Sequence, residues 1–289
     1  MSTSQQEVVT RGVLDSVRGL LGGPSRDGDE WCFDLGEHLH NNWGAVYGGA
    51  LSAAMLAVAR SATPERSPRS IHVQMVRSVP GGRVVTAVGV RHSGRTVATV
   101  EVELFDDRDK LAAIALVTMV TPDAVAAEYD HTIAAPAFRL AETPVAVGDG
   151  IPGASVAPVV ATLNLTPLGE TGRLSAENAR SSVDGSSAAV MKCAVPWENL
   201  ECTGPEAACL AADAAVGPAI DFSYISSKDI GPNVDLSLRF TTAPATRVIV
   251  AASTMLSVER GTATVGIEVQ AGDNQLAHGL ASSLLLHRR

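Results

Sequence analysis

The sequence predicts an α+β fold that is built twice, and two observations carry this prediction. In each half of the 289-residue chain, a helix of small apolar residues precedes four strands that alternate apolar and polar side chains. The halves also share short segments, because Arg95–Val100 matches Arg260–Val265 in its Arg, Ala, Thr and Val residues. Such internal similarity indicates duplication of one structural unit.

The first half contains one helix and a meander of strands. Residues 1–29 are predicted to form a short helix and a loop, and a glycine-rich turn at residues 41–49 leads into the next helix. That helix, over Ala50–Arg60, is almost uniformly apolar, which predicts that it is buried on all sides. Strands are predicted over Trp31–Leu35, Ser70–Val79, Arg83–His92, Thr96–Phe105 and Leu111–Val120.

The second half repeats this order. A helix is predicted over Glu206–Val216, followed by strands over Asn233–Thr241, Arg247–Glu259, Thr262–Gln270 and Leu276–Leu286. Five prolines in residues 122–158 indicate a connector between the halves. We therefore expect an N-terminal unit at 1–121, a connector at 122–155 and a C-terminal unit at 156–289.

Composition restricts the class of function. A formal net charge of −9 and a sequence pI of about 5.2 disfavour nucleic acid as a partner, because phosphate backbones need a basic surface. The N-terminus shows no secretory signal, and no apolar run is long enough to span a membrane. The four cysteines form no CxxC pair and have no histidine at zinc-ligand spacing. These features predict a cytoplasmic protein without a metal site.

One apolar helix followed by a long antiparallel meander resembles the hotdog fold, and two in one chain resemble the double-hotdog acyl-CoA thioesterases of the thioesterase II type. The resemblance covers most of the chain. It rests on the order of the segments Val46–Gly49, Ser70–Gln74, Ala211–Ala214, Val234–Phe240 and Leu276–His278. It implies a double hotdog that acts on an acyl-CoA thioester, with CoA as part of the substrate and no other cofactor.

Asp213 is the most informative residue, because it stands in the middle of an otherwise apolar, alanine-rich helix. A carboxylate in such a helix is expensive to bury unless it is hydrogen-bonded or used in chemistry. It matches the catalytic aspartate in the second hotdog of the resembled family. The alternative is that Asp213 faces solvent or caps a neighbouring strand. The first helix has no acidic residue between Ala50 and Ala59, so we expect at most one carboxylate site per chain.

The residues around Asp213 depart from the resembled family. That family commonly places a hydroxyl at the start of the next strand, where this chain has Asn233, whose amide can donate a hydrogen bond to water or to a carboxylate. It also places a glutamine on the last strand, and counting from Leu276 gives Ala281 at that position. A shift by one residue would offer Ser282, but on the other face of the strand.

Other candidates are predicted to bind substrate. Gly48 and Gly49 precede the first helix, where backbone N–H groups can stabilise an oxyanion, or they form an ordinary turn. Arg95 and Arg260 begin matching strands and would either hold the CoA phosphates or lie exposed. Trp43 and Tyr47, beside the helix entry, would line a tunnel mouth or a capped loop. His72 would contact substrate or belong to the core.

The sequence thus predicts an acyl-CoA thioesterase in which Asp213 activates water or attacks the carbonyl, Asn233 orients the water, and Gly48 and Gly49 stabilise the oxyanion. A dehydratase, hydratase or isomerase on the same fold is an alternative, because a fold does not determine the chemistry. A non-catalytic binder of acyl-CoA or lipid is another. By analogy with the resembled family, we also expect a homodimer or a larger homo-oligomer that acts in lipid metabolism.

Overall fold

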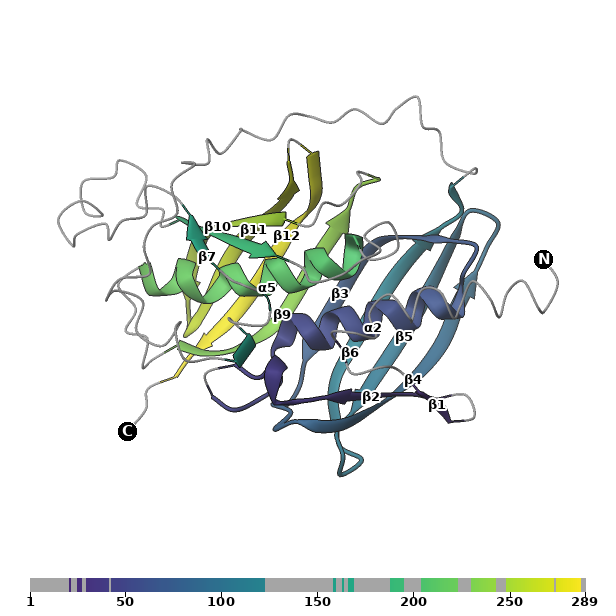
Figure 1. Ribbon diagram of the computed structural model, residues 1–289. Coiled ribbons are helices and arrows are strands. Elements are labelled where there is room, and N and C mark those ends of the chain that lie inside the picture. The colour runs from purple at the N-terminus through teal and green to yellow at the C-terminus, as the bar shows by residue number, and fades with distance from the viewer. Residues whose placement is uncertain are drawn as a thin grey trace.

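The structure is a computed structural model of the 289-residue chain. It describes residues 21, 25–27, 30–41, 43–122, 158–159, 163, 166–168, 188–194, 204–222, 230–242, 248–272 and 274–286. Within these residues, twelve strands form one antiparallel sheet, and two long helices lie side by side along its concave side (Figure 1). The predicted connector lies almost wholly outside the described residues.

The N-terminal half follows the predicted order closely. Helix α2 spans Gly48–Ala62, so it begins two residues before the predicted start and includes both glycines. The alternating segments that follow all form strands, and β6 has the predicted bounds. The strands of this half are β1 (Ser25–Asp27), β2 (Glu30–Leu35), β3 (Ser67–Met75), β4 (Gly82–Ser93), β5 (Val97–Phe105) and β6 (Leu111–Val120), with a 3-10 helix η1 at Glu37–Leu39.

The C-terminal half repeats this arrangement around helix α5, which spans Gly204–Phe222 and extends beyond the predicted helix at both ends. Two strands of this half were not predicted, β7 (Thr166–Leu168) and β8 (Ala188–Ala194), which lie before the helix. In the first half, β1 was not predicted either, because residues 1–29 were expected to form a helix and a loop. The remaining strands are β9 (Ile230–Phe240), β10 (Val248–Glu259), β11 (Thr262–Ala271) and β12 (Asn274–Leu285).

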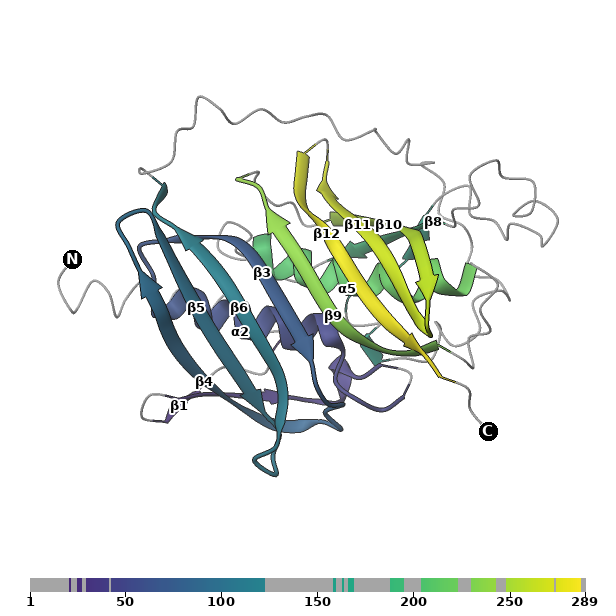
Figure 2. The same cartoon turned by 180° about the vertical axis from the view of Figure 1, so that it is seen from behind.

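The two halves meet in the middle of the sheet, whose strand order is β1-β2-β4-β5-β6-β3-β9-β12-β11-β10-β8-β7. Strands β3 and β9 pair antiparallel over Ser70–Gln74, with His72 opposite Ser237. The sheet therefore runs without interruption from one half into the other, and Figure 2 shows this junction from the convex side.

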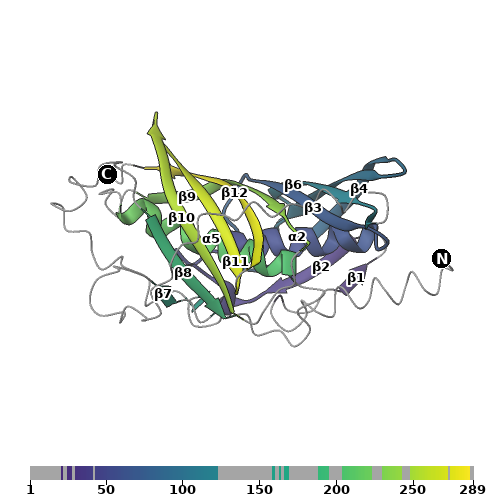
Figure 3. The same ribbon diagram turned by 90° about the horizontal axis from the view of Figure 1, so that it is seen from above.

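The core lies between the helices and the concave face of the sheet (Figure 3). Twelve of the fifteen residues of α2 are buried, as its apolar composition predicts. Along β5 and β11, buried residues alternate with partly exposed ones, because successive side chains point to opposite faces of a sheet. One face of each strand thus packs against a helix, and the other faces away from it.

The helices α2 and α5 touch each other closely at two places. At the start of α2, an added Cβ on Gly49 would lie only 3.0 Å from the Cys209 carbonyl oxygen and from the Leu210 Cα, so only glycine fits there. Farther along, Arg60 donates two hydrogen bonds, of 2.6 and 2.8 Å, to the Glu206 carboxylate. The Glu206 side chain is fully buried, so this ion pair lies inside the molecule.

Candidate active site

The centre of the site is Asp213, in the middle of α5, where this helix meets the start of α2. The residue is 6% exposed, and both of its carboxylate oxygens accept hydrogen bonds. Oδ2 accepts from the Gly49 N–H at 2.9 Å, and Oδ1 accepts from the Asn233 side-chain amide at 2.5 Å. The solvent-facing side chain that the sequence left open is therefore excluded.

Burial changes the acidity of this carboxyl. Removal from water raises the pKa of Asp213 to about 6, while the hydrogen bonds from Asn233 and Gly49 lower it. A carboxylate with a pKa in this range is ionised at neutral pH and still basic enough to take a proton from water. The pKa of the nearby Cys209 thiol is also raised, first by burial and then by the negative charges of Glu206 and Asp213. This cysteine is therefore a poor nucleophile.

A β-bulge turns Asn233 toward the helix. Asp235 lies opposite Ser282 and Asn233 lies opposite Ser283, so Val234 is an extra residue on β9 that has no partner on β12. Bulges of this kind redirect a side chain, and they are common next to active sites. The extra residue lets Asn233 point inward, as the buried Leu236 does, instead of outward.

Ser283 completes the network, and the sequence analysis missed it. Its hydroxyl is buried and donates to the Asn233 side-chain carbonyl, which fixes the amide so that its nitrogen faces Asp213. Counting along the sequence gave Ala281 for this position, but Ala281 is a buried residue opposite Leu236. In a regular ladder Asn233 would lie opposite Leu284, and the bulge places it opposite Ser283 instead.

The two glycines at the start of α2 have different surroundings. The Gly49 N–H is engaged by Asp213, so in this arrangement it holds the carboxylate. Among the described residues, the Gly48 N–H, which belongs to the first turn of the helix, makes no hydrogen bond. An N–H at a helix start favours negative charge on a nearby oxygen.

The equivalent position in the other half lacks this chemistry. Counted from the first residue of each helix, Ala57 corresponds to Asp213, and Pro205 corresponds to Gly49. Alanine has no carboxylate, and proline has no N–H to donate. The neighbouring residue Glu206 is instead paired with Arg60. The described residues therefore hold one carboxylate in this arrangement.

The other predicted site residues do not gather around Asp213. Tyr47 is buried and donates to the Leu210 carbonyl at 2.5 Å. Trp43 is 49% exposed, in the loop before α2. His72 is exposed and lies between the buried Ile71 and Val73, so it faces away from the helices. Exposed positions in the tight turns before β5 and β11 are occupied by Arg95 and Arg260. Their roles in substrate binding stay predictions.

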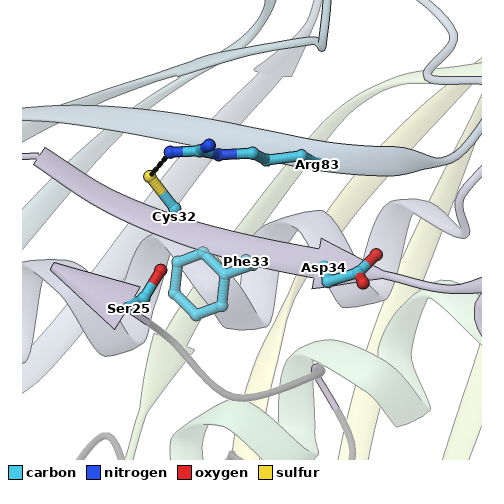
Figure 4. Close-up of a pocket in the computed structure, with 5 residues that line it drawn as sticks. All are labelled: Ser25, Cys32, Phe33, Asp34 and Arg83. Atoms are coloured by element: carbon cyan, nitrogen blue, oxygen red, sulfur yellow. Dashed lines mark hydrogen bonds between the residues drawn. The ribbon is translucent and has the colours of Figure 1, made fainter. Parts of the chain in front are cut away.

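A separate pocket of about 360 Å³ lies between β1, β2 and β4. Figure 4 shows its lining residues, Ser25, Cys32, Phe33, Asp34 and Arg83. Arg83 donates to the Cys32 sulfur at 3.1 Å. The pocket includes none of the residues around Asp213 or any other predicted site residue.

Two searches for other kinds of site gave no candidates. Among the described residues, no group of three or more His, Cys, Asp or Glu side chains is arranged to hold a metal ion. In the same part of the chain, no helix has the length and apolar character needed to cross a membrane.

Several solved structures are similar to this chain over nearly its whole length. A protein of unknown function with a hot dog fold from Alicyclobacillus acidocaldarius has a TM-score of 0.71 and 15% identity, over 96% of this chain and 99% of that one. Acyl-CoA thioesterase II TesB2 from Mycobacterium marinum has a TM-score of 0.67 and 14% identity, over 96% and 98%. The tesB protein of Mycobacterium avium subsp. paratuberculosis has a TM-score of 0.67 and 15% identity, over 96% and 99%.

At these identities, the structural likeness shows the fold, and the chain is a hot dog protein. Residues 39–120, which include α2 and the strands that follow it, match the family model of the acyl-CoA thioesterase N-terminal domain. In this segment, which is less than half of the chain, the sequence is thus similar to acyl-CoA thioesterases. No curated protein sequence matches the chain.

Proposed function

We propose that Asp213 is the general base in the hydrolysis of an acyl-CoA thioester to a free acid and CoA. The observation that carries this proposal is the buried carboxylate held on both oxygens beside the start of α2. In the proposed reaction, water attacks the thioester carbonyl carbon while Asp213 takes a proton from the water. Collapse of the tetrahedral intermediate breaks the carbon–sulfur bond, and the protonated Asp213 returns the proton to the leaving CoA sulfur.

The surrounding groups have separate roles in this proposal. The Gly48 N–H donates to the oxyanion of the intermediate, aided by the positive end of the α2 dipole. Gly49 and Asn233 hold the carboxylate in place, and Ser283 keeps the Asn233 amide in the orientation that donates to it. The sequence assigned Asn233 to the water, whereas its contact with Oδ1 supports a role in positioning the base. The reaction as written needs no metal and no redox cofactor.

Release of free thiol from a series of acyl-CoA substrates tests this proposal. Asp213→Ala and Asp213→Asn should each lower kcat/KM by about 10²–10⁴-fold, the contribution typical of a positioned base. Asp235→Asn is the matched control, because Asp235 is on the same strand as Asn233 but opposite Gln74, on the face away from Asp213. The kcat/KM of the parent should fall below about pH 6, where Asp213 takes up a proton.

Full activity in both Asp213 variants would refute the assignment of the base. Tight CoA binding by the parent without thiol release from any substrate would favour the acyl-CoA binder, the alternative open from the sequence.

We further propose that the two units form a double hot dog, with units at 1–121 and 156–289 joined by a connector at 122–155. The repeated order of helix and strands in the described residues supports this division. We also propose a homo-oligomer, since large apolar side chains, Leu116, Leu256 and Leu280, are 45–57% exposed on the sheet. Its mass in solution, measured by light scattering, tests this. A cytoplasmic location and a role in lipid metabolism remain part of the same proposal.

A further inference from the structure

Met75, the last residue of β3, lies directly against the start of α2. An ideal Cβ added to Gly48 would lie 2.7 Å from the Met75 methyl carbon and 2.9 Å from its sulfur. The same point lies 3.1 Å from Oδ2 of Asp213. The thioether and the carboxylate therefore both border the space over the Gly48 Cα, and a side chain at position 48 would have to displace the end of Met75.

This placement brings Met75 to the place where the proposed reaction occurs. The carbonyl carbon under attack must lie near Asp213, and its oxygen must reach the Gly48 N–H, so the substrate has to enter the space beside Gly48. Met75 already borders that space. A thioester cannot lie within reach of both groups without touching the Met75 side chain or displacing it.

The chemistry of Met75 indicates which part of the substrate it meets. Its side chain is apolar, only partly exposed, and packed against the hydrophobic core. An acyl chain is apolar next to its carbonyl, whereas the pantetheine arm of CoA carries amides that favour water. Because methionine is flexible and polarizable, it can adapt to an aliphatic chain.

We propose that Met75 is a specificity-determining residue, which packs on the acyl carbons adjacent to the thioester carbonyl and disfavours branching at the α-carbon. This inference rests on the proposed function of Asp213. It concerns the class of substrate: acyl-CoA molecules with an unbranched α-carbon are accepted, and those with an α-methyl group are rejected.

Isomeric substrates test the inference with little interference from general loss of activity. Butyryl-CoA and isobutyryl-CoA have the same composition and differ in branching at the α-carbon, and heptadecanoyl-CoA with its isomer 2-methylhexadecanoyl-CoA extends the comparison to long chains. The measured quantity is the ratio of kcat/KM for the branched substrate to kcat/KM for the straight one. The Met75→Ala variant should raise this ratio by about 10-fold or more, because a methyl-sized change in a pocket is worth about 10–200-fold.

Two further variants separate specificity from stability. Met75→Leu, which nearly conserves the side-chain volume, should keep the parental ratio. Met255→Ala is the matched control, since Met255 is also partly buried and packed against the core but belongs to β10 of the other half. It should leave the ratio unchanged even if it lowers the melting temperature.

An unchanged ratio in Met75→Ala, with both substrates hydrolysed, would overturn the inference. A change in KM that is equal for both isomers would overturn it too, and would place Met75 on the CoA arm. If the parent releases no thiol from any acyl-CoA, the proposed function fails by itself. In that case, calorimetry measures the dissociation constants of the same isomers for the parent and for Met75→Ala. A larger gain in affinity for the branched isomer supports the inference, and equal changes in affinity or absence of binding overturn it.

Discussion

The buried carboxyl of Asp213 should make the stability of the fold depend on pH, and replacing it by asparagine should remove that dependence. Its pKa is about 6 in the folded chain, against 3.8 for an ordinary aspartate, so the folded chain holds the proton more tightly than the unfolded chain. The contribution to stability is therefore fully present below about pH 4 and is lost as the pH rises through 6.

The magnitude follows from the two pKa values. Their difference corresponds to about 3 kcal/mol lost by neutral pH, of which about 1.4 kcal/mol is lost between about pH 5 and about pH 7.5. Asp213→Asn cannot ionise at this position. The stability of the variant minus that of the parent, measured as the free energy of unfolding, should thus be about 1.4 kcal/mol larger at the higher pH than at the lower.

Urea unfolding of both chains at the two pH values measures this difference, with the free energy extrapolated to water. Effects of the substitution on hydrogen bonding to Gly49 and Asn233 are the same at both pH values and cancel. If the variant and the parent differ by the same amount at both pH values, the reasoning is refuted, because the carboxyl would then have an ordinary pKa in the fold.

Two further predictions concern the contacts between the helices. Arg60→Met and Glu206→Leu each remove one partner of the buried ion pair, and each should lower the free energy of unfolding in urea by about 3–5 kcal/mol. The double variant should be much closer to the parent, because it leaves no charge unpaired. Equal losses in the single and double variants would contradict this. Gly49→Ala should destabilise the fold, because its Cβ would meet the backbone of Cys209. Gly217→Ala, in open space within α5, should instead stabilise the fold by up to about 1 kcal/mol and raise the melting temperature. Stabilisation by both variants would show that the helices can separate.

Much of the fold was predictable, because hydrophobic periodicity is a local property of the sequence. The helix at Gly48–Ala62 and the strand at Leu111–Val120 follow from composition and alternation alone. Strand β8 was missed since it precedes its helix and has no counterpart in the pattern used to define the repeat. The pairing of β3 with β9 joins distant residues, and no local pattern indicates it.

The site was predictable where one residue contradicts its surroundings, as Asp213 does in an apolar helix. The inward turn of Asn233 depends on the unpaired Val234, and a bulge leaves no reliable mark in an alternating strand. Ser283 was missed for the same reason, because counting assumes a regular register. Met75 looks like any core methionine in the sequence, and only its packing on Gly48 distinguishes it.

The pairing of β3 with β9 means that the chain is joined twice, once by its covalent connector and once by a hydrogen-bonded ladder at Ser70–Gln74. Cutting the connector with a protease would leave the ladder and the helix contacts to hold the halves together. A half produced alone would instead expose β3 or β9 as a bare strand edge, which readily pairs with another chain. Two identical halves could then pair through these bare edges and form a junction like the central one.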